Sequence, residues 1–201
     1  FVSALPSGPG SIGEELIAEI VAGVPPGVAT MLLTSRTDGP GIVAQLRRTR
    51  ASIVQLVDEV PALTYRILRD LAPSVRLVQV IHVRGAGALD DALAAAAHVD
   101  ALLLDSGNPS LKVKELGGTG RVHDWGTSAR IRAASPVPVW LAGGLHAGNV
   151  AEAIQQVRPF GVDVCSGVRA AGRLDAERLR AFVAVVDEAR VAEGATEGAH
   201  A

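Results

Sequence analysis

Residues 101–125 read ALLLDSGNPSLKVKELGGTGRVHDW, and this stretch decides how the rest of the chain is interpreted. It begins with an apolar run at 101–104, which is typical of a parallel strand buried on both faces. Asp105 ends that run, and the glycine-rich sequence GGTG follows at 117–120. Ligands of α/β proteins bind at the carboxyl ends of parallel strands. An acid at such an end, followed by a glycine-rich loop, therefore predicts a reaction centre.

Either feature alone has a simpler structural explanation. Asp105 could cap a turn, and the glycines could serve only to bend the chain. Their occurrence together, in one strand-to-helix connection, favours a functional interpretation.

The composition predicts a globular enzyme-sized domain and excludes several other classes of protein. The chain has 201 residues, of which 48% are hydrophobic and 3% aromatic, with a formal net charge of −2. There is no basic block and few aromatic residues, so nucleic acid is not an expected partner. No apolar run reaches the length of about 18 residues needed to cross a bilayer, and the expected location is the cytoplasm.

Cysteine and histidine usage argues against a metal site in this sequence. Cys165 is the single cysteine, which excludes an internal disulfide and a cysteine-ligated metal site. The five histidines show no ligand spacing. No metal and no organic cofactor are expected.

Strand-like and helical segments alternate along the whole chain. The expected strands lie at 1–5, 28–34, 52–57, 76–83, 101–105, 137–141 and 161–164. The more distinct helical patterns lie at 12–24, 125–134, 149–157 and 176–191. This alternation predicts a parallel sheet with helical crossovers, as in a doubly wound sheet or a (β/α)8 TIM barrel.

The barrel is favoured over the doubly wound sheet. Functional loops are spread along the chain, and the first turn, PSGPG at 6–10, lacks the GxGxxG signature of a dinucleotide-binding sheet. The expected domain covers residues 1–190, with 191–201 as a disordered tail. Seven strands are visible, and the chain begins at Phe1 rather than Met, so we expect the first βα unit to be missing.

The last two strand ends predict an anion site. LAGGL at 141–145 and VDVCSGV at 162–168 each end a strand with small residues. Glycine lets backbone N–H groups approach an anion closely, and barrels often bind phosphate after their last two strands. The alternative is that these glycines serve only packing. A small phosphorylated sugar is the expected ligand.

Four blocks in this order resemble phosphoribosylanthranilate isomerase, the (β/α)8 enzyme of tryptophan biosynthesis. They are LLLDS at 102–106, GGTGRVHDW at 117–125, LAGGLHAGNVAEAI at 141–154 and RPFGVDVCSGV at 158–168. The resemblance is strong over residues 99–185. Over residues 1–98 it is limited to the alternation of strands and helices.

The resemblance implies a cofactor-free Amadori rearrangement, in which a phosphoribosyl aminoaldose becomes an aminoketose. Such a reaction needs an acid for the ring oxygen and a base for the C2 proton. Asp105 matches the general acid of the family, and Asp163 matches a carboxylate lining the last strand. The other matching positions are the phosphate loops, Gly143, Gly144, Ser166 and Gly167, and the loop beside the acid, Gly118, Thr119 and Gly120.

The sequence also departs from the family. The general base of the family is a cysteine in a Lys-x-Cys-Gly motif on the first strand, and this chain has no such motif. The family usually has a basic residue for the anthranilate carboxylate where this chain has PSGPG at 6–10. Val57-Asp58 replaces a His-Gly pair of the family. Either His82 or Arg84 could substitute for the missing partner of the anthranilate carboxylate. Cys165 is an unfavourable replacement base, because a neighbouring phosphate would raise the pKa of its thiol.

Three interpretations stay open from the sequence alone. The chain is a phosphoribosylanthranilate isomerase recorded without its first βα unit, or a divergent phosphosugar barrel with another substrate. The third possibility is a non-catalytic relative that lacks the base. The sequence does not determine the oligomeric state.

Overall fold

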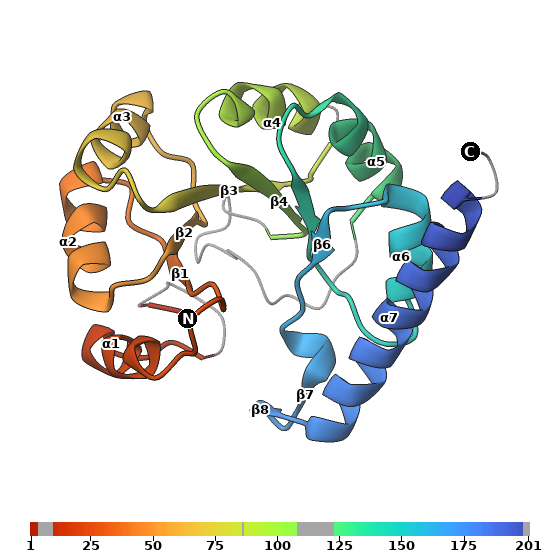
Figure 1. The fold of residues 1–201 in the computed structure, drawn as a ribbon. Helices are drawn as coiled ribbons and strands as arrows, with labels where there is room; N and C mark the ends of the chain where they lie inside the picture. The colour runs from red at the N-terminus through yellow and green to blue at the C-terminus, as the bar shows by residue number, and fades with distance from the viewer. Residues whose placement is uncertain (4–9, 86, 108–122, 199–201) are drawn as a thin grey trace.

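The computed structural model describes residues 1–3, 10–85, 87–107 and 123–198, with side chains as far as residue 191 (Figure 1). Within these residues the main sheet consists of β1 (Met31–Thr34), β2 (Ile53–Leu56), β3 (Arg76–His82), β4 (Ala101–Asp105), β5 (Val139–Leu141) and β6 (Gly161–Val162). The helices are α1 (Glu14–Ala22), α2 (Gly39–Thr49), α3 (Ala62–Leu71), α4 (Ala88–Ala96), α5 (Trp125–Ala134), α6 (Val150–Val157) and α7 (Ala176–Gly198). A short 3-10 turn, η1 (Ser166–Val168), leads into a hairpin of β7 (Arg169–Ala170) and β8 (Arg173–Leu174).

The sheet is parallel throughout and curls like part of a barrel. Its strand order is β1-β2-β3-β4-β5-β6, so each strand pairs with its neighbours in sequence. The helices lie on the outer side of the curl (Figure 1). Of the seven expected strands, the described residues form six in this sheet. Residues 1–3, expected to begin the first strand, contribute a parallel bridge between Val2 and Leu33.

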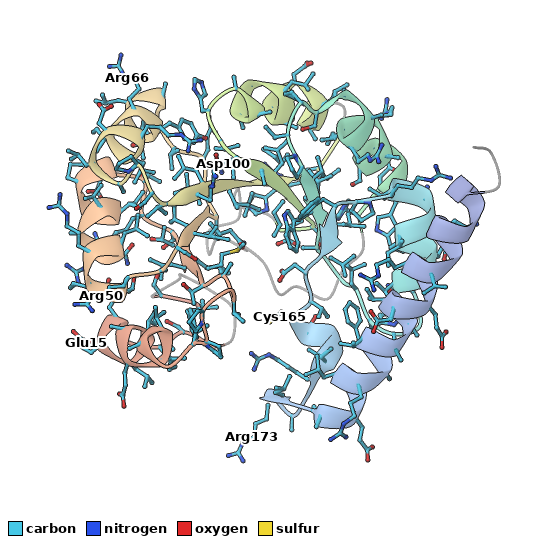
Figure 2. All side chains as sticks on the ribbon, in the orientation of Figure 1. Glu15, Arg50, Arg66, Asp100, Cys165 and Arg173 are labelled. Carbon is cyan, nitrogen blue, oxygen red and sulfur yellow. The ribbon has the colours of Figure 1, made fainter. Side chains whose placement is uncertain are left out.

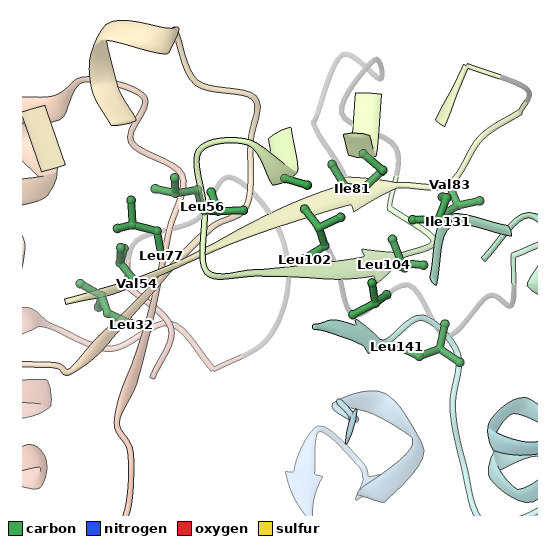
Figure 3. Packing of buried hydrophobic residues seen from close by; sticks show 14 of the residues in the cluster. Leu32, Val54, Leu56, Leu77, Ile81, Val83, Leu102, Leu104, Ile131 and Leu141 are labelled. Carbon is green, nitrogen blue, oxygen red and sulfur yellow. The ribbon is translucent and has the colours of Figure 1, made fainter. Parts of the chain in front are cut away.

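Alternation along each strand separates an outer core from an inner one. Leu102 and Leu104 of β4 belong to the outer cluster, which packs under the helices together with Leu56 and Leu77 (Figure 3). Leu103 belongs to a smaller inner cluster, which includes Val78, Val80, Ala101 and Ala142. A strand buried on both faces is what the continuous apolar run at 101–104 predicts.

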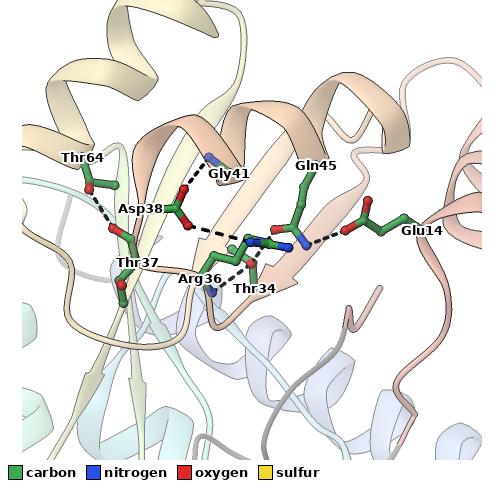
Figure 4. A network of polar contacts seen from close by, with 8 residues as sticks. All are labelled: Glu14, Thr34, Arg36, Thr37, Asp38, Gly41, Gln45 and Thr64. Carbon is green, nitrogen blue, oxygen red and sulfur yellow. Dashed lines mark hydrogen bonds and ion pairs between the residues drawn. The ribbon is translucent and has the colours of Figure 1, made fainter.

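Polar contacts connect β1 to the helices on either side of it in the chain. Thr34 Oγ1 donates to Gln45 Oε1 at 2.7 Å, and Gln45 Nε2 donates to Glu14 Oε1 at 2.8 Å (Figure 4). This chain of hydrogen bonds joins β1, α2 and α1. Asp38 caps α2 by accepting the N–H of Gly41 at 2.7 Å, which satisfies a backbone donor of the first turn.

The end of the chain differs from the sequence prediction. The helix expected at 176–191 continues as α7 to Gly198, through residues that were predicted to be a disordered tail. Residues 191–198 contain two alanines and two glutamates, which favour helix, together with two glycines, which do not. The helix at 125–134 has the predicted bounds.

Among the described residues, none of the helices is both long and apolar enough to span a membrane.

Candidate active site at the carboxyl ends of the strands

Asp105 is the last residue of β4, and only 5% of it is exposed. The backbone N–H of Ser106 donates to its Oδ1 at 2.7 Å. Burial raises the pKa of the Asp105 carboxyl, and the hydrogen bond from Ser106 and the charge of His82 offset part of that rise. A carboxyl group with a raised pKa keeps its proton closer to neutral pH, which a general acid requires.

His82 ends β3 and pairs in register with Asp105. Because residues in register on parallel strands point to the same face, both side chains face the inside of the curl. Nε2 of His82 lies 3.0 Å from the carbonyl oxygen of Val57. Its Nδ1 is buried and has no hydrogen-bond partner in the described part of the chain. Burial lowers the pKa of His82 and so favours the neutral imidazole, although the contact with Val57 and the charge of Asp105 oppose this.

Asp163 follows β6 on the same inner face. Its backbone N–H donates to Leu141 O at 2.8 Å, which continues the ladder between β5 and β6. The residue is exposed to solvent, but its register with Ala142 and Asp105 places its side chain on the inner side of the curl, near other protein atoms. This surrounding protein raises the pKa of the Asp163 carboxyl, and the negative charge of Asp105 raises it further. The two carboxyl groups are therefore close enough to influence each other.

The loop after β5 packs directly against the acid. Gly143 and Gly144 have φ values of +84° and +66°, in the left-handed region that favours glycine. A Cβ on Gly143 would lie 2.8 Å from the backbone nitrogen of Ser106 and 3.1 Å from Oδ1 of Asp105. Only a residue without a side chain leaves this approach undisturbed.

The loop after β6 packs in turn against the loop after β5. A Cβ on Gly167 would lie 2.0 Å from the carbonyl oxygen of Leu145, so no side chain fits there. Nδ2 of Asn149 donates to Gly144 O at 3.1 Å, and its Oδ1 accepts the N–H of His146 at 2.8 Å. The structure thus brings the two predicted anion loops together and holds them in place.

These adjoining loops offer backbone donors to an anion. In the described residues, no protein acceptor takes the N–H of Gly143, Gly144, Ser166 or Gly167. Unpaired amides of neighbouring loops can hold a phosphate group, which carries several acceptor oxygens.

The remaining predicted positions take different places. Gly118, Thr119 and Gly120 lie outside the described residues. Cys165 is half-buried in the connection between β6 and η1, beside Ser166 (Figure 2). Within the described ranges, no group of three or more His, Cys, Asp or Glu side chains could hold a metal ion.

Two residues near the site were not predicted from the sequence. Ala142 lies on the inner face between the strands of Asp105 and Asp163, and strand alternation from Trp140 would have placed it there. Arg169, which follows η1, places its Nη2 3.4 Å from the position of a Cβ on Gly10. No sequence pattern indicates that second contact, because it joins residues at opposite ends of the chain.

Comparisons with known sequences agree with this geometry. The sequence profile of the N-(5'-phosphoribosyl)anthranilate isomerase family matches residues 12–185. The N-(5'-phosphoribosyl)anthranilate isomerase of Methanocella arvoryzae is 37% identical over 165 residues, which cover 82% of this chain and 75% of that protein. The enzyme of the same name from Haloferax volcanii is 38% identical and is matched over 79% of its length, with 90% of this chain covered.

Solved structures show the same fold. The phosphoribosylanthranilate isomerase of Thermotoga maritima aligns with a TM-score of 0.74 at 26% identity, over 89% of this chain and 82% of that one. A phosphoribosylanthranilate isomerase in complex with reduced 1-(o-carboxyphenylamino)-1-deoxyribulose 5-phosphate aligns with a TM-score of 0.69 at 26% identity, over 86% of this chain and 78% of that one.

Proposed function

Because this chain belongs to the N-(5'-phosphoribosyl)anthranilate isomerase family, we propose that it isomerises N-(5'-phosphoribosyl)anthranilate in tryptophan biosynthesis. The product is the corresponding 1-(o-carboxyphenylamino)-1-deoxyribulose 5-phosphate. One observation carries the proposal within the chain itself. Asp105, a buried carboxyl group of raised pKa, lies against Gly143, and the loop of Gly143 packs on that of Gly167.

We assign the general-acid step to Asp105. Its proton goes to the ring oxygen of the furanose, and the bond between that oxygen and C1 breaks, which leaves an iminium ion between C1 and the aromatic nitrogen. A base then removes the proton from C2, and the resulting enolamine rearranges to the ketone at C2. The burial of Asp105 supports this assignment, because it raises the pKa of the carboxyl group, as the role of a general acid requires.

The substrate phosphate is assigned to the amides of the two adjoining loops. Gly143 and Gly144 would provide N–H groups from one loop, and Ser166 and Gly167 from the other. A phosphate held there would fix one end of the sugar while Asp105 acts on its ring. Asp163 would line the same space, where the negative charge of Asp105 adds to the surrounding protein in raising its pKa.

The architecture that we propose is a (β/α)8 barrel, with residues 1–190 as its single domain in this chain. The curled parallel sheet and the barrel-like isomerases that align with it support this view. We also propose a cytoplasmic location. Phosphorylated sugars do not pass an apolar bilayer, because transfer of their charge is too costly.

The direct test is turnover by the purified protein. Incubation with N-(5'-phosphoribosyl)anthranilate should give a loss of anthranilate-type fluorescence at a rate proportional to the amount of protein. A parallel titration with inorganic phosphate reports on the anion loops. Phosphate binding without any turnover would contradict the proposed reaction and favour another phosphosugar as the substrate.

A further inference from the structure

We propose that Arg169 binds the carboxylate of the anthranilate ring and thereby selects the substrate. This inference rests on the function proposed above and names the residue that recognises the aromatic end of the substrate. Arg169 directly follows the last of the four sequence blocks that resemble the family, which ends at residue 168.

Arg169 lies close enough to the phosphate loops for one substrate molecule to contact both. It begins β7, two residues after Gly167, and two residues of extended chain span at most about 7 Å. Its side chain is half-buried, and Nη1 donates to Gly172 O at 2.9 Å. The carbonyl oxygen of Arg169 accepts Nη1 of Arg178 at 2.6 Å. The guanidinium group is therefore held by its own hairpin near one end of the proposed phosphate site.

The side chain of Arg169 reaches from the β7–β8 hairpin toward the beginning of the chain. Nη2 of Arg169 lies 3.4 Å from the position of a Cβ on Gly10, whose φ is +89°. Ser11 Oγ, on the next residue, donates to Ser3 O at 3.0 Å, at the end of the segment that pairs with β1. Gly10 therefore lies at the carboxyl end of that segment, on the same side of the sheet as Asp105. The absence of a side chain at Gly10 leaves space for the guanidinium group.

Among the residues that the structure describes, no acidic side chain neutralises the charge of Arg169. Arg36, which follows β1, has Asp38 at 3.8 Å instead (Figure 4). A half-buried guanidinium group without a carboxylate partner is suited to bind one from a ligand, because its planar N–H groups match the two oxygens.

The chemistry of the substrate requires two different anion sites. N-(5'-phosphoribosyl)anthranilate carries a phosphate at C5 of the sugar and a carboxylate on the aromatic ring, at opposite ends of the molecule. The loop amides suit the phosphate oxygens, and the guanidinium of Arg169 suits the planar carboxylate. One substrate would then bridge the loop of Gly167 and the side chain of Arg169.

Calorimetric binding separates the two ends of the ligand. The probes are reduced 1-(o-carboxyphenylamino)-1-deoxyribulose 5-phosphate, the same compound without its carboxylate, and inorganic phosphate. Arg169→Met should weaken binding of the first probe about 10- to 100-fold, the range of a charge-assisted hydrogen bond. It should leave the other two within about twofold of wild type. Arg169→Lys should bind the first probe with an affinity between those of wild type and Arg169→Met, because lysine keeps the positive charge but lacks the paired N–H donors of the guanidinium group.

Arg173→Met is the matched control. Arg173 belongs to the same hairpin but is exposed at its tip and points away from the sheet (Figure 2). This variant should bind all three probes like wild type. Thermal unfolding of each variant confirms that the comparison is made between folded proteins.

Each other outcome overturns the proposal in a recognisable way. If Arg169→Met weakens binding of all three probes equally, the side chain binds the phosphate or supports the folded structure, and does not bind the carboxylate. No weakening of the first probe shows that the carboxylate binds elsewhere. The predicted pattern without turnover of N-(5'-phosphoribosyl)anthranilate by wild type contradicts only the proposed function. Failure of wild type to bind the first probe overturns both.

Discussion

Asp105 and Asp163 face each other across Ala142 on the inner side of the sheet. The register pairs Leu104 with Leu141 and Leu141 with Val162. The next residue along each of these strands is Asp105, Ala142 or Asp163, so these three side chains are aligned. Ala142 is small and buried, so it leaves space between the two carboxyl groups. The charge of Asp105 consequently acts on Asp163 and raises its pKa, in addition to the effect of the surrounding protein.

Asp105→Asn should stabilise the protein at neutral pH. The folded state raises the pKa of Asp105 by burial, so the folded chain binds its proton more tightly than the unfolded chain. The resulting contribution to stability is present below the unfolded pKa and is lost as the pH rises through the folded pKa. Each unit of the shift corresponds to about 1.4 kcal/mol. Urea unfolding from pH 4 to pH 8 should show the gain of the variant growing with pH.

Asp100→Asn is the matched control for this measurement. Burial raises the pKa of Asp100, but hydrogen bonds from the backbone of Leu77 and from Arg69 outweigh it and hold that pKa below its usual range. The stability that Asp100 contributes is therefore present above its unfolded pKa and is lost as the pH falls. Its variant should be less stable than wild type at neutral pH. Parallel pH dependences for the two variants would contradict the account of Asp105.

The pKa of Asp163 should fall when Asp105 is replaced by asparagine. The substitution removes the negative charge that disfavours ionisation of Asp163, although the surrounding protein still raises its pKa. The carboxyl carbon of Asp163, followed by NMR during a pH titration, should reach its midpoint at lower pH in Asp105→Asn than in wild type. An unchanged midpoint would mean that the two groups do not interact.

Gly143→Ala should impair both stability and catalysis. The new Cβ would meet the backbone of Ser106 at 2.8 Å and displace Asp105, in addition to the strain of a φ of +84°. We expect a loss of about 1–3 kcal/mol in unfolding free energy and a lower kcat. Gly27→Ala is the control, because Gly27 has a φ of +92° but nothing within 4 Å of its Cβ position. If both variants lose the same stability and neither loses activity, the contact with the acid has no importance.

His123 should make the protein sensitive to mild acid. Burial lowers the pKa of His123 to about 4, while its Nε2 contacts Ser128 Oγ at 2.7 Å. Between about pH 6.5 and pH 4 the unfolded chain binds a proton at this position and the folded chain does not. The protein therefore becomes less stable as the pH decreases. The loss amounts to at most about 3 kcal/mol. His123→Gln should flatten the decline in thermal unfolding temperature over this range, and an equally steep decline would contradict the assignment.

The sequence predicts the inner acids because their positions follow from local rules. The apolar run at 101–104 ends at Asp105 in the structure as expected, and alternation within a parallel strand places that side chain inward. The glycines at 143, 144 and 167 were singled out by their place after strands. The packing of Gly143 against Ser106 and of Gly167 against Leu145 is a property of the assembled fold.

Other features could not be predicted because they depend on contacts distant in sequence or on weak local preferences. The approach of Arg169 to Gly10 requires the sheet to curl, and no pattern near either residue encodes it. The extension of α7 to Gly198 depends on helix propensity in a polar segment, which composition alone suggested to be disordered. The lowered pKa of His82 likewise follows from its burial in the folded state.

The most direct test of the account is the activity of Asp105→Asn with its phosphate site intact. Asparagine keeps an oxygen for the N–H of Ser106 but has no proton to transfer. We predict that kcat for N-(5'-phosphoribosyl)anthranilate falls by at least about 1,000-fold, toward the upper range for loss of a general acid, while the Kd for inorganic phosphate stays within about twofold of wild type. Full activity in this variant would contradict the role of Asp105.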